Sequence, residues 1–194
     1  MTGHLSPEEA VATRTTSLIP TGTWAVDAAH SSVEFGIKHM GIATVRGKFT
    51  EFEGTLAVGE DLASSSVQGN VKVASITTDV EQRDAQLRSP DFFNVEEYPE
   101  ITFESARIDA IDDESSYIVG NLTMHGITSE VKLNAVVQGK DVDSWGNDRV
   151  GLEVVGVLKR SDFDMKFNQA LGSVNVLVGD IVNISLHISA VKQP

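Results

Sequence analysis

Residues 182–190, Val-Asn-Ile-Ser-Leu-His-Ile-Ser-Ala, decide the fold, because apolar and polar side chains alternate there without a break. The same period of two runs through residues 32–38 and 130–138. Successive side chains of a strand point to opposite faces, so this alternation predicts antiparallel strands with one hydrated face. Further strand-like runs bring the total to about eight, with little helix between them, which is typical of a barrel or a sandwich. Closure removes the exposed edges of a sheet, and we therefore predict an all-β, eight-stranded antiparallel barrel with one or two short helices.

The phase of the alternation changes once within residues 42–58. Apolar residues occupy odd positions at Val45 and Phe49, and even positions at Phe52 and Leu56. A shift of one residue inside a strand-like run indicates a β-bulge or a bend. We expect a corner of the barrel at this point.

Helix signals are confined to two short segments. Residues 6–9, Ser-Pro-Glu-Glu, combine an N-cap, a proline at the first helical position and a capping-box glutamate. Residues 79–82 open a second helix that is expected to end near Arg88, before a turn at Ser89-Pro90. We assign residues 1–20 to an N-terminal extension, partly helical or flexible, and residues 21–194 to the barrel domain.

The composition excludes several classes of function. The formal charge of −13 argues against nucleic acids and anionic membrane surfaces as partners. The chain has no cysteine, which excludes disulfides, thiolate metal sites and a cysteine nucleophile. We find no signal peptide in the first twenty residues and no apolar run long enough to span a membrane. A cytoplasmic location without stable membrane insertion is the expectation.

The histidines are the obvious candidates for catalysis or metal binding. His30 and His39 flank a strand and His125 ends another, but no H-x-H or H-x-x-x-H spacing brings them together. The sequence also lacks the G-x-S-x-G turn of a serine hydrolase, and its partial matches to phosphate and calcium loops lack essential residues. We predict no metal site, no required cofactor and no enzymatic activity. An enzyme that uses these three histidines on an apolar substrate remains the alternative.

Some of the predicted strands are apolar on both faces. Ile118 and Leu122 lie on one side of their strand and Val119 on the other, and Leu152 and Val155 show the same arrangement. A second apolar face packs against a helix, a partner chain or a ligand, and the pattern alone leaves these three possibilities open. A structural or signalling module with a dimer interface is therefore a third reading.

The segment from residue 79 to residue 95 is expected at a barrel mouth. Phe92 and Phe93 are adjacent and cannot face the same way, so at least one should enter the core while the other closes the mouth or lines a cavity. Arg83 at this mouth could hold a polar head group or form an ion pair with a nearby carboxylate.

Seven sequence segments, found in order between residues 22 and 192, together resemble the YceI-like proteins. They are Trp24-Ala-Val-Asp-Ala-Ala-His-Ser31, Val33-Glu-Phe-Gly-Ile-Lys-His39, Val45-Arg-Gly-Lys-Phe49 with Phe52-Glu-Gly54, Arg83-Asp84 with Leu87-Arg-Ser89 and Asp91-Phe-Phe93, Tyr98-Pro-Glu-Ile-Thr-Phe103, Gly120-Asn-Leu-Thr-Met-His-Gly126, and Arg160-Ser-Asp-Phe163.

The resemblance implies a lipocalin-like barrel whose apolar pore holds a polyisoprenoid or a similar amphiphile, such as an isoprenoid quinone or a fatty-acid derivative. It also implies a possible homodimer, and export to the periplasm for many relatives that carry a signal. Two positions depart from the family pattern: Gln86 replaces a histidine, and Asp164 replaces a glycine and suggests a different turn.

We therefore predict a protein that carries or sequesters a long-chain amphiphile. The acidic net charge favours a neutral head group, such as a quinone ring, over a diphosphate. The candidate ligand-binding residues are His30, Val33, Phe35, Ile37, His39, Phe49, Arg83, Leu87, Phe92, Phe93, Phe103, Leu122, Met124 and His125.

Overall fold

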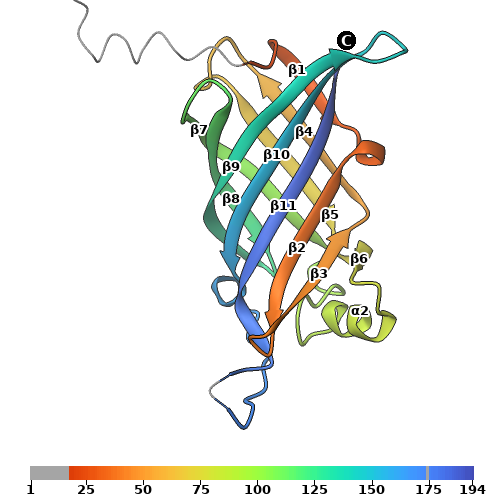
Figure 1. Ribbon diagram of the computed structural model, residues 1–194, viewed down its shortest axis with the longest axis vertical. Coiled ribbons are helices and arrows are strands. Elements are labelled where there is room, and N and C mark those ends of the chain that lie inside the picture. The colour runs from red at the N-terminus through yellow and green to blue at the C-terminus, as the bar shows by residue number, and fades with distance from the viewer. Residues whose placement is uncertain (1–17, 174) are drawn as a thin grey trace, which may run out of the picture.

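The structure, a computed structural model, describes residues 18–173 and 175–194, and it is a closed antiparallel barrel (Figure 1). The wall consists of eight staves. Three of them are each formed by two short strands that follow one another in line, and five are each formed by one long strand. The paired strands are β1 (Gly22–Val26) with β2 (Ser32–His39), β3 (Ala43–Phe49) with β4 (Phe52–Val58), and β5 (Ser66–Lys72) with β6 (Ile76–Thr77). The long strands are β7 (Glu100–Ala110), β8 (Ser115–Met124), β9 (Ile127–Val142), β10 (Asp148–Lys159) and β11 (Val178–Lys192). The predicted eight-stranded barrel is confirmed.

Pairing of β11 with both β1 and β2 closes the barrel. Lys192 lies opposite Trp24 in β1, and Leu186 lies opposite Val33 in β2. A short 3-10 turn, η1 (Ala28–His30), separates the two halves of this wall. The pairing is continuous at the β1 side of the barrel, whereas beside α2 β3 pairs with β6 only at Lys48 and Phe49.

The phase change predicted within residues 42–58 is the break between β3 and β4. β3 ends at Phe49 and β4 begins at Phe52, so the two strands direct side chains of opposite parity into the barrel. The hydroxyl of Ser75, in the 3-10 turn η2 (Val73–Ser75), accepts hydrogen bonds from the backbone nitrogens of Thr50 and Glu51 at 3.1 and 3.0 Å. The backbone N–H groups at the bend, where strand pairing is interrupted, thus donate to a side chain instead.

The predicted second helix is α2 (Glu81–Arg88), and it lies beside β6. Arg88 attaches the helix to the wall, because its Nε donates to the carbonyl of Ala74 at 3.0 Å and its Nη2 to that of Ile76 at 2.9 Å. The helix predicted at residues 6–9 falls outside the described residues. No helix among the described residues is long and apolar enough to cross a membrane.

A third 3-10 turn, η3 (Arg160–Phe163), follows β10. Asp164 ends it with a φ of 57°, in the left-handed region that favours glycine. The aspartate at this position therefore occupies a turn of the kind that a glycine would also adopt. Its carboxylate forms an ion pair with Lys166.

The two ends of the barrel differ. The α2 end carries α2, η3, the β2–β3 turn (residues 40–42) and the loop of residues 164–177, and is the lower end in Figure 1. The closed end carries the turns of residues 59–65, 111–114 and 143–147, and η1 lies in the wall near this end. Because α2 lies at one end, it does not cover the outer face of β10, where Val155 and Val157 are exposed (Figure 1). The second apolar face of that strand is therefore not packed on the helix.

Candidate ligand cavity

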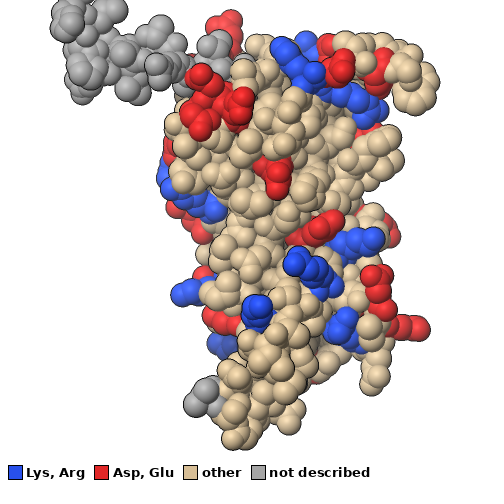
Figure 2. Space-filling view, in the orientation of Figure 1, with Lys and Arg blue, Asp and Glu red and all other residues tan. Residues whose placement is uncertain are grey.

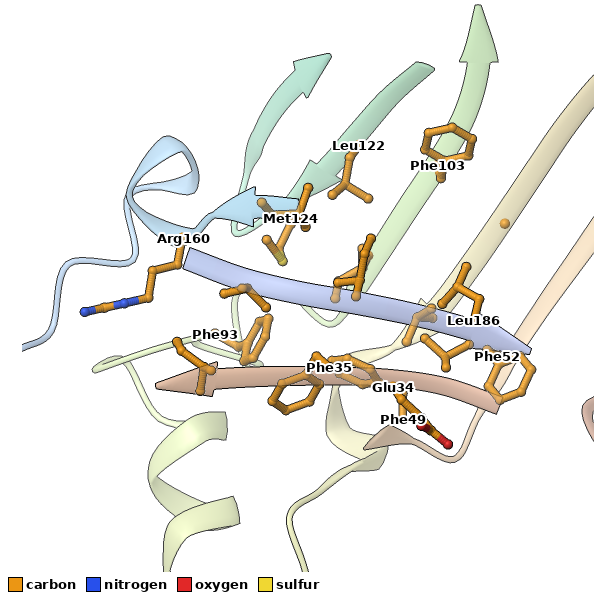
Figure 3. A pocket seen from close by; sticks show the side chains of 18 of the residues that line it. Glu34, Phe35, Phe49, Phe52, Phe93, Phe103, Leu122, Met124, Arg160 and Leu186 are labelled. Atoms are coloured by element: carbon orange, nitrogen blue, oxygen red, sulfur yellow. The ribbon is translucent and has the colours of Figure 1, made fainter. Parts of the chain in front are cut away.

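The inward faces of the strands line an apolar cavity of about 600 Å³ (Figure 3). Its lining residues extend from Val33 to His39 on β2 and from Val182 to Ile188 on β11. Six residues of strand span about 20 Å, so the cavity is long in the direction of the strands. Its volume lies within the range of about 300–1,000 Å³ that is usual for small-molecule sites.

All but two of the candidate ligand-binding residues line this cavity. The lining residues among them are Val33, Phe35, Ile37, His39, Phe49, Arg83, Leu87, Phe92, Phe93, Phe103, Leu122 and Met124. The exceptions are His30 and His125, which do not line the cavity, so a ligand-binding role for them stays a prediction. Both lie just beyond a strand end, where the period of two no longer determines the direction of the side chain.

Large aromatic rings fit into the wall because glycines face them. A Cβ on Gly47 would lie 2.4 Å from Cζ of Phe35, and a Cβ on Gly120 would lie 2.7 Å from Cζ of Phe103. Both contacts are far shorter than van der Waals distance, so any larger residue at these positions would displace the ring. These glycines let the two rings lie close to the wall and leave the middle of the barrel open.

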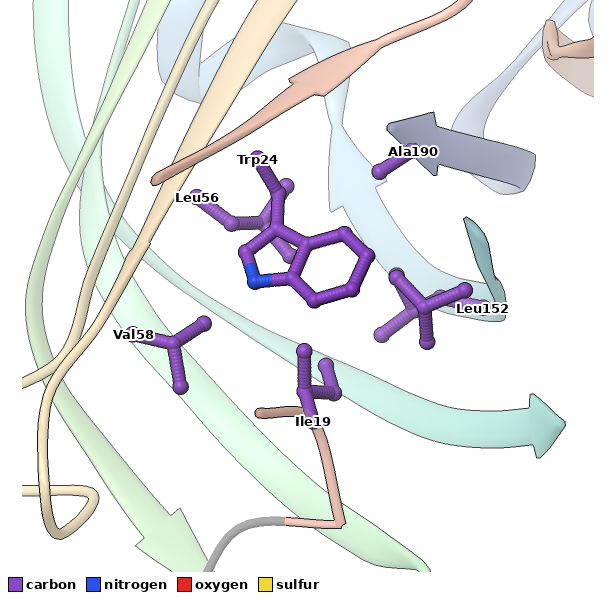
Figure 4. Packing of buried hydrophobic residues seen from close by; sticks show 7 residues of the cluster. Ile19, Trp24, Leu56, Val58, Leu152 and Ala190 are labelled. Atoms are coloured by element: carbon purple, nitrogen blue, oxygen red, sulfur yellow. The ribbon is translucent and has the colours of Figure 1, made fainter. Parts of the chain in front are cut away.

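A tryptophan blocks the closed end of the barrel (Figure 4). Trp24 is 1% exposed and packs with Ile19, Leu56, Val150 and Leu152. Its indole Nε1 donates to the carbonyl of Pro20 at 2.9 Å, which satisfies the only polar atom of the ring. Ile19, which the sequence prediction had placed in the N-terminal extension, therefore belongs to the core of the barrel.

The cavity reaches the surface at the α2 end. Val80, Gln82 and Gln86 line it and are also exposed to solvent. Phe92 and Phe93 both line it as well, and the ring of Phe93 packs edge-on against Phe49 with 6.0 Å between centroids. This opening beside α2, which we call the mouth, lies where the sequence placed it.

Thr78 holds Arg83 at the mouth. Its Oγ1 accepts from Arg83 Nε at 2.7 Å and its carbonyl accepts from Arg83 Nη2 at 3.0 Å. Among the described residues Arg83 makes no ion pair, so the predicted carboxylate pairing is absent. The guanidinium is half-buried and lines the cavity, which leaves its remaining donors for a ligand.

The neighbouring Asp84 is buried and fixes Thr78 in turn. Its Oδ1 accepts from Thr78 N at 2.8 Å and from Thr78 Oγ1 at 2.5 Å. Burial acts to raise the pKa of Asp84, but the hydrogen bonds from Thr78 and the charge of Arg88 outweigh it and hold the pKa below its usual value. The carboxylate therefore stays ionised and keeps Thr78 oriented towards Arg83.

Arg160 is a lining residue that the sequence analysis did not select. It is 5% exposed, and its guanidinium donates to the backbone carbonyls of Gly179, Met165 and Val178 at 2.8, 2.8 and 3.3 Å. Burial lowers the pKa of Arg160 from its usual value. The side chain ties η3 to the start of β11, and Figure 3 shows it directed away from the apolar middle of the cavity. The sequence signal that could have drawn attention to Arg160 is a basic residue directly after an apolar strand.

The three candidate catalytic histidines do not converge. His30 and His39 lie at opposite ends of β2, more than about 20 Å apart. His30 Nδ1 lies 2.8 Å from Asp27 Oδ2 on the surface, whereas His125 Nδ1 lies 2.8 Å from the carbonyl of Phe163. The described residues also contain no cluster of three or more metal-binding side chains. The geometry gives these histidines no shared site.

The surface contact of His30 belongs to a charged cluster at the closed end. Arg149 Nη1 pairs with Asp27 Oδ2 at 2.8 Å and Arg149 Nε with Asp143 Oδ2 at 2.7 Å. The hydrogen bond from Arg149, aided by His30, lowers the pKa of Asp27 to about 2. The cluster connects η1 to the β9–β10 turn and lies outside the cavity.

An eight-stranded antiparallel barrel around an apolar cavity, blocked at one end and open at the other, defines the lipocalin-like class of small-molecule-binding proteins. Within that class the family follows from comparison with known proteins. The sequence model of the YceI-like domain family matches residues 24–190, and the chain belongs to this family.

Sequence relatives agree with this assignment, and solved structures share the fold. A UPF0312 protein of Pectobacterium atrosepticum is 38% identical over 140 residues, which cover 72% of each chain. The crystal structure of BcnA from Burkholderia cenocepacia superposes with a TM-score of 0.73 at 25% identity, over 84% of this chain and 98% of that one. A polyisoprenoid binding domain from Saccharophagus degradans, implicated in plant cell wall breakdown, gives a TM-score of 0.68 at 13% identity, over 88% of this chain and 98% of that one.

Proposed function

We propose that this chain binds and carries or sequesters a long-chain amphiphile: a polyisoprenoid, an isoprenoid quinone or a fatty-acid derivative. The observation that carries the proposal is the long apolar cavity, blocked at one end by Trp24 and open at the other beside Arg83. A tail inserted through the mouth points towards Trp24, and its head group stays beside α2.

The hydrophobic effect supplies the affinity. Each methylene group moved from water into the cavity contributes about 0.8 kcal/mol, so a chain of ten or so carbons binds tightly without polar contacts. The solved domain from Saccharophagus degradans, which has the same fold, is described as binding polyisoprenoids. That description supports a polyprenyl tail as the first ligand to test.

The donors at the mouth favour a neutral head group with oxygen acceptors. Arg83 retains donors beyond its two bonds to Thr78. Arg88 and Arg160, in contrast, direct theirs to backbone carbonyls. Arg83 has already given two donors to Thr78 and lies next to the ionised Asp84, and apart from Arg160, Lys38 is the one other lysine or arginine among the described lining residues. This site suits a carbonyl or hydroxyl oxygen better than a diphosphate, which needs several free cations. We therefore favour a quinone or an alcohol head group.

Native mass spectrometry of protein purified without detergent tests the proposal. We expect an adduct with the mass of an apolar lipid, which organic extraction removes. After extraction, farnesol should bind, and the emission of Trp24 should change as the tail approaches it. A Trp145→Phe variant removes the only other tryptophan, which is 80% exposed. Absence of any lipid adduct, together with no binding of farnesol or of decylubiquinone, would refute a carrier function.

A further inference from the structure

The β2–β3 hairpin differs in charge from the rest of the molecule. The chain has 28 acidic and 15 basic residues, yet residues 35–50 contain Lys38, Arg46 and Lys48 and no acidic side chain. All three basic side chains are exposed. Lys48 lies opposite Glu34, but Lys38 and Arg46 lie opposite Thr44 and Gly36, so their charges are not balanced across the pair of strands.

Exposed apolar side chains surround the tip of this hairpin. Ile42 is 78% exposed, and Met40, Val176 and Ile181 are 37, 44 and 45% exposed. A hydrogen bond of 3.0 Å from Met40 N to the carbonyl of Leu177 joins the tip to the loop of residues 164–177. Apolar side chains in water at one tip, beside unbalanced cations, are the pattern of a surface that meets a partially apolar, anionic partner.

Acidic residues lie at both ends of the barrel, including the exposed Asp79, Glu81 and Asp91 in or beside α2, but none lies within residues 35–50. At the closed end, three turns and the strand residues next to them carry eight of them: Glu60, Asp61, Asp112, Asp113, Glu114, Asp141, Asp143 and Asp148. Figure 2 shows acidic side chains on the upper part of the molecule and beside α2, whereas the lowest part is formed mostly of uncharged residues. Near the tip itself, Asp164 is paired with Lys166, and the carboxylate of Asp180 accepts from Ser161 N and Oγ.

The apolar tip adjoins the mouth of the cavity. Lys38, His39 and Leu177, which flank the tip, also line the cavity. A surface that lies against the tip therefore meets the opening through which a ligand passes. A lipid bilayer that contains anionic lipids is both anionic and partially apolar, because its charged head groups lie directly over an apolar interior.

We propose that the docking tip, defined as Met40, Ile42, Val176 and Ile181 with Lys38 and Arg46, binds the surface of a bilayer that contains anionic lipids. The apolar side chains enter the boundary between head groups and acyl chains, and the two cations contact anionic head groups. The contact is reversible and shallow, since the tip buries only four side chains. It places the mouth of the cavity against the membrane.

Co-sedimentation with vesicles tests the docking tip. Wild-type protein is expected to sediment with vesicles of phosphatidylcholine mixed with phosphatidylglycerol, less with phosphatidylcholine alone, and less again as salt is added. Each cation removed should lower the partition coefficient about fivefold, so a Lys38→Gln/Arg46→Gln double variant should lose about 25-fold. Ile42→Ser should lose about tenfold or more.

Trp145→Ser is the matched control, because Trp145 is an 80% exposed apolar residue at the closed end. It should bind vesicles as the wild type does, and near-UV circular dichroism should show that all variants are folded. Gly69 on β5 lines the cavity, outside the docking tip, so filling the cavity through Gly69→Leu should leave vesicle binding unchanged. This variant separates docking from uptake of single lipids. The proposal is overturned if the wild type does not sediment, if the double variant binds unchanged, or if Trp145→Ser weakens binding as much as Ile42→Ser.

Discussion

Filling the cavity from Gly69 should stabilise the unliganded protein and weaken ligand binding at the same time. Gly69 faces the cavity on β5, between Val67 and Val71, which both pack into the core. A Cβ at this position would meet only the carbonyl oxygen of Glu53, at an ordinary 3.7 Å. A leucine therefore fits the backbone and directs its side chain into the open space.

The size of both effects follows from four added carbons. They displace about four methylene groups of a bound tail, which at about 0.8 kcal/mol each is about 3 kcal/mol, or roughly a hundredfold in dissociation constant. The unliganded protein gains up to about 1.5–3 kcal/mol from burial of the leucine, and a smaller gain from the reduced freedom of the unfolded chain.

Equilibrium dialysis with labelled farnesol measures the first effect, and urea denaturation of the delipidated protein measures the second. Gly151→Leu is the matched control, since Gly151 lies between the buried Val150 and Leu152 and so faces outward. A Cβ there would meet its nearest neighbour at 3.6 Å. The control should bind farnesol as the wild type does. Unchanged affinity in a folded Gly69→Leu protein would show that the tail does not occupy the barrel.

Three further substitutions test contacts that stabilise the barrel. Trp24→Ala should lower the free energy of unfolding by about 3–5 kcal/mol in urea denaturation, because it empties the closed end of the barrel. Arg160→Met should cost about 3–5 kcal/mol in the same assay, since it leaves three backbone carbonyls without their donor; a loss below about 1 kcal/mol would mean that water replaces the guanidinium. Asp27 has a folded-state pKa of about 2, below its unfolded value of about 4, so its contribution is complete above about pH 4 and disappears as the pH falls through 2. The difference in unfolding free energy between wild type and Arg149→Gln should accordingly be constant above about pH 4 and shrink towards pH 2, and a difference that does not vary with pH would contradict this role of Arg149.

The barrel could be predicted because a period of two survives along several of its strands. The apolar stripe of residues 182–190 and the phase change between Phe49 and Phe52 depend only on which face of the wall each residue takes. That face is a local property of an extended chain. The signal for the end of α2 at Arg88 was also local, because Ser89-Pro90 cannot continue a helix.

Residues that depend on contacts between distant segments could not be predicted. Arg160 is buried only because the carbonyl of Gly179, nineteen residues later, lies beside it. Its position after β10 is equally compatible with an exposed side chain. The directions of the His30 and His125 side chains could not be predicted for a related reason. Each residue lies outside a strand, so Asp27 and the carbonyl of Phe163 determine where it points.

The lining contributed by the loop of residues 164–177 was missed as well. Phe167 and Leu177 lie in a loop without a period, yet both line the cavity. Phe167 reaches it by packing on Phe92, with 5.2 Å between the ring centroids. The mouth is thus completed by a segment whose pattern carries no information about its direction.

The net charge of the whole chain does not determine how the docking tip meets a membrane, because electrostatic interactions in salt are local. At physiological ionic strength the Debye length is about 8 Å. The acidic turns of the closed end lie beyond strands such as β2, eight residues and about 25 Å long, so their charge is almost fully screened at the docking tip. An anionic bilayer in contact with the docking tip therefore interacts with the charges of Lys38 and Arg46 rather than with the net charge of −13 of the whole chain. The anionic bilayer also repels the acidic closed end. A molecule that approaches the bilayer is therefore turned with its mouth towards the membrane. Raising the salt concentration should weaken the docking that we propose, while leaving the affinity of the apolar cavity for farnesol unchanged.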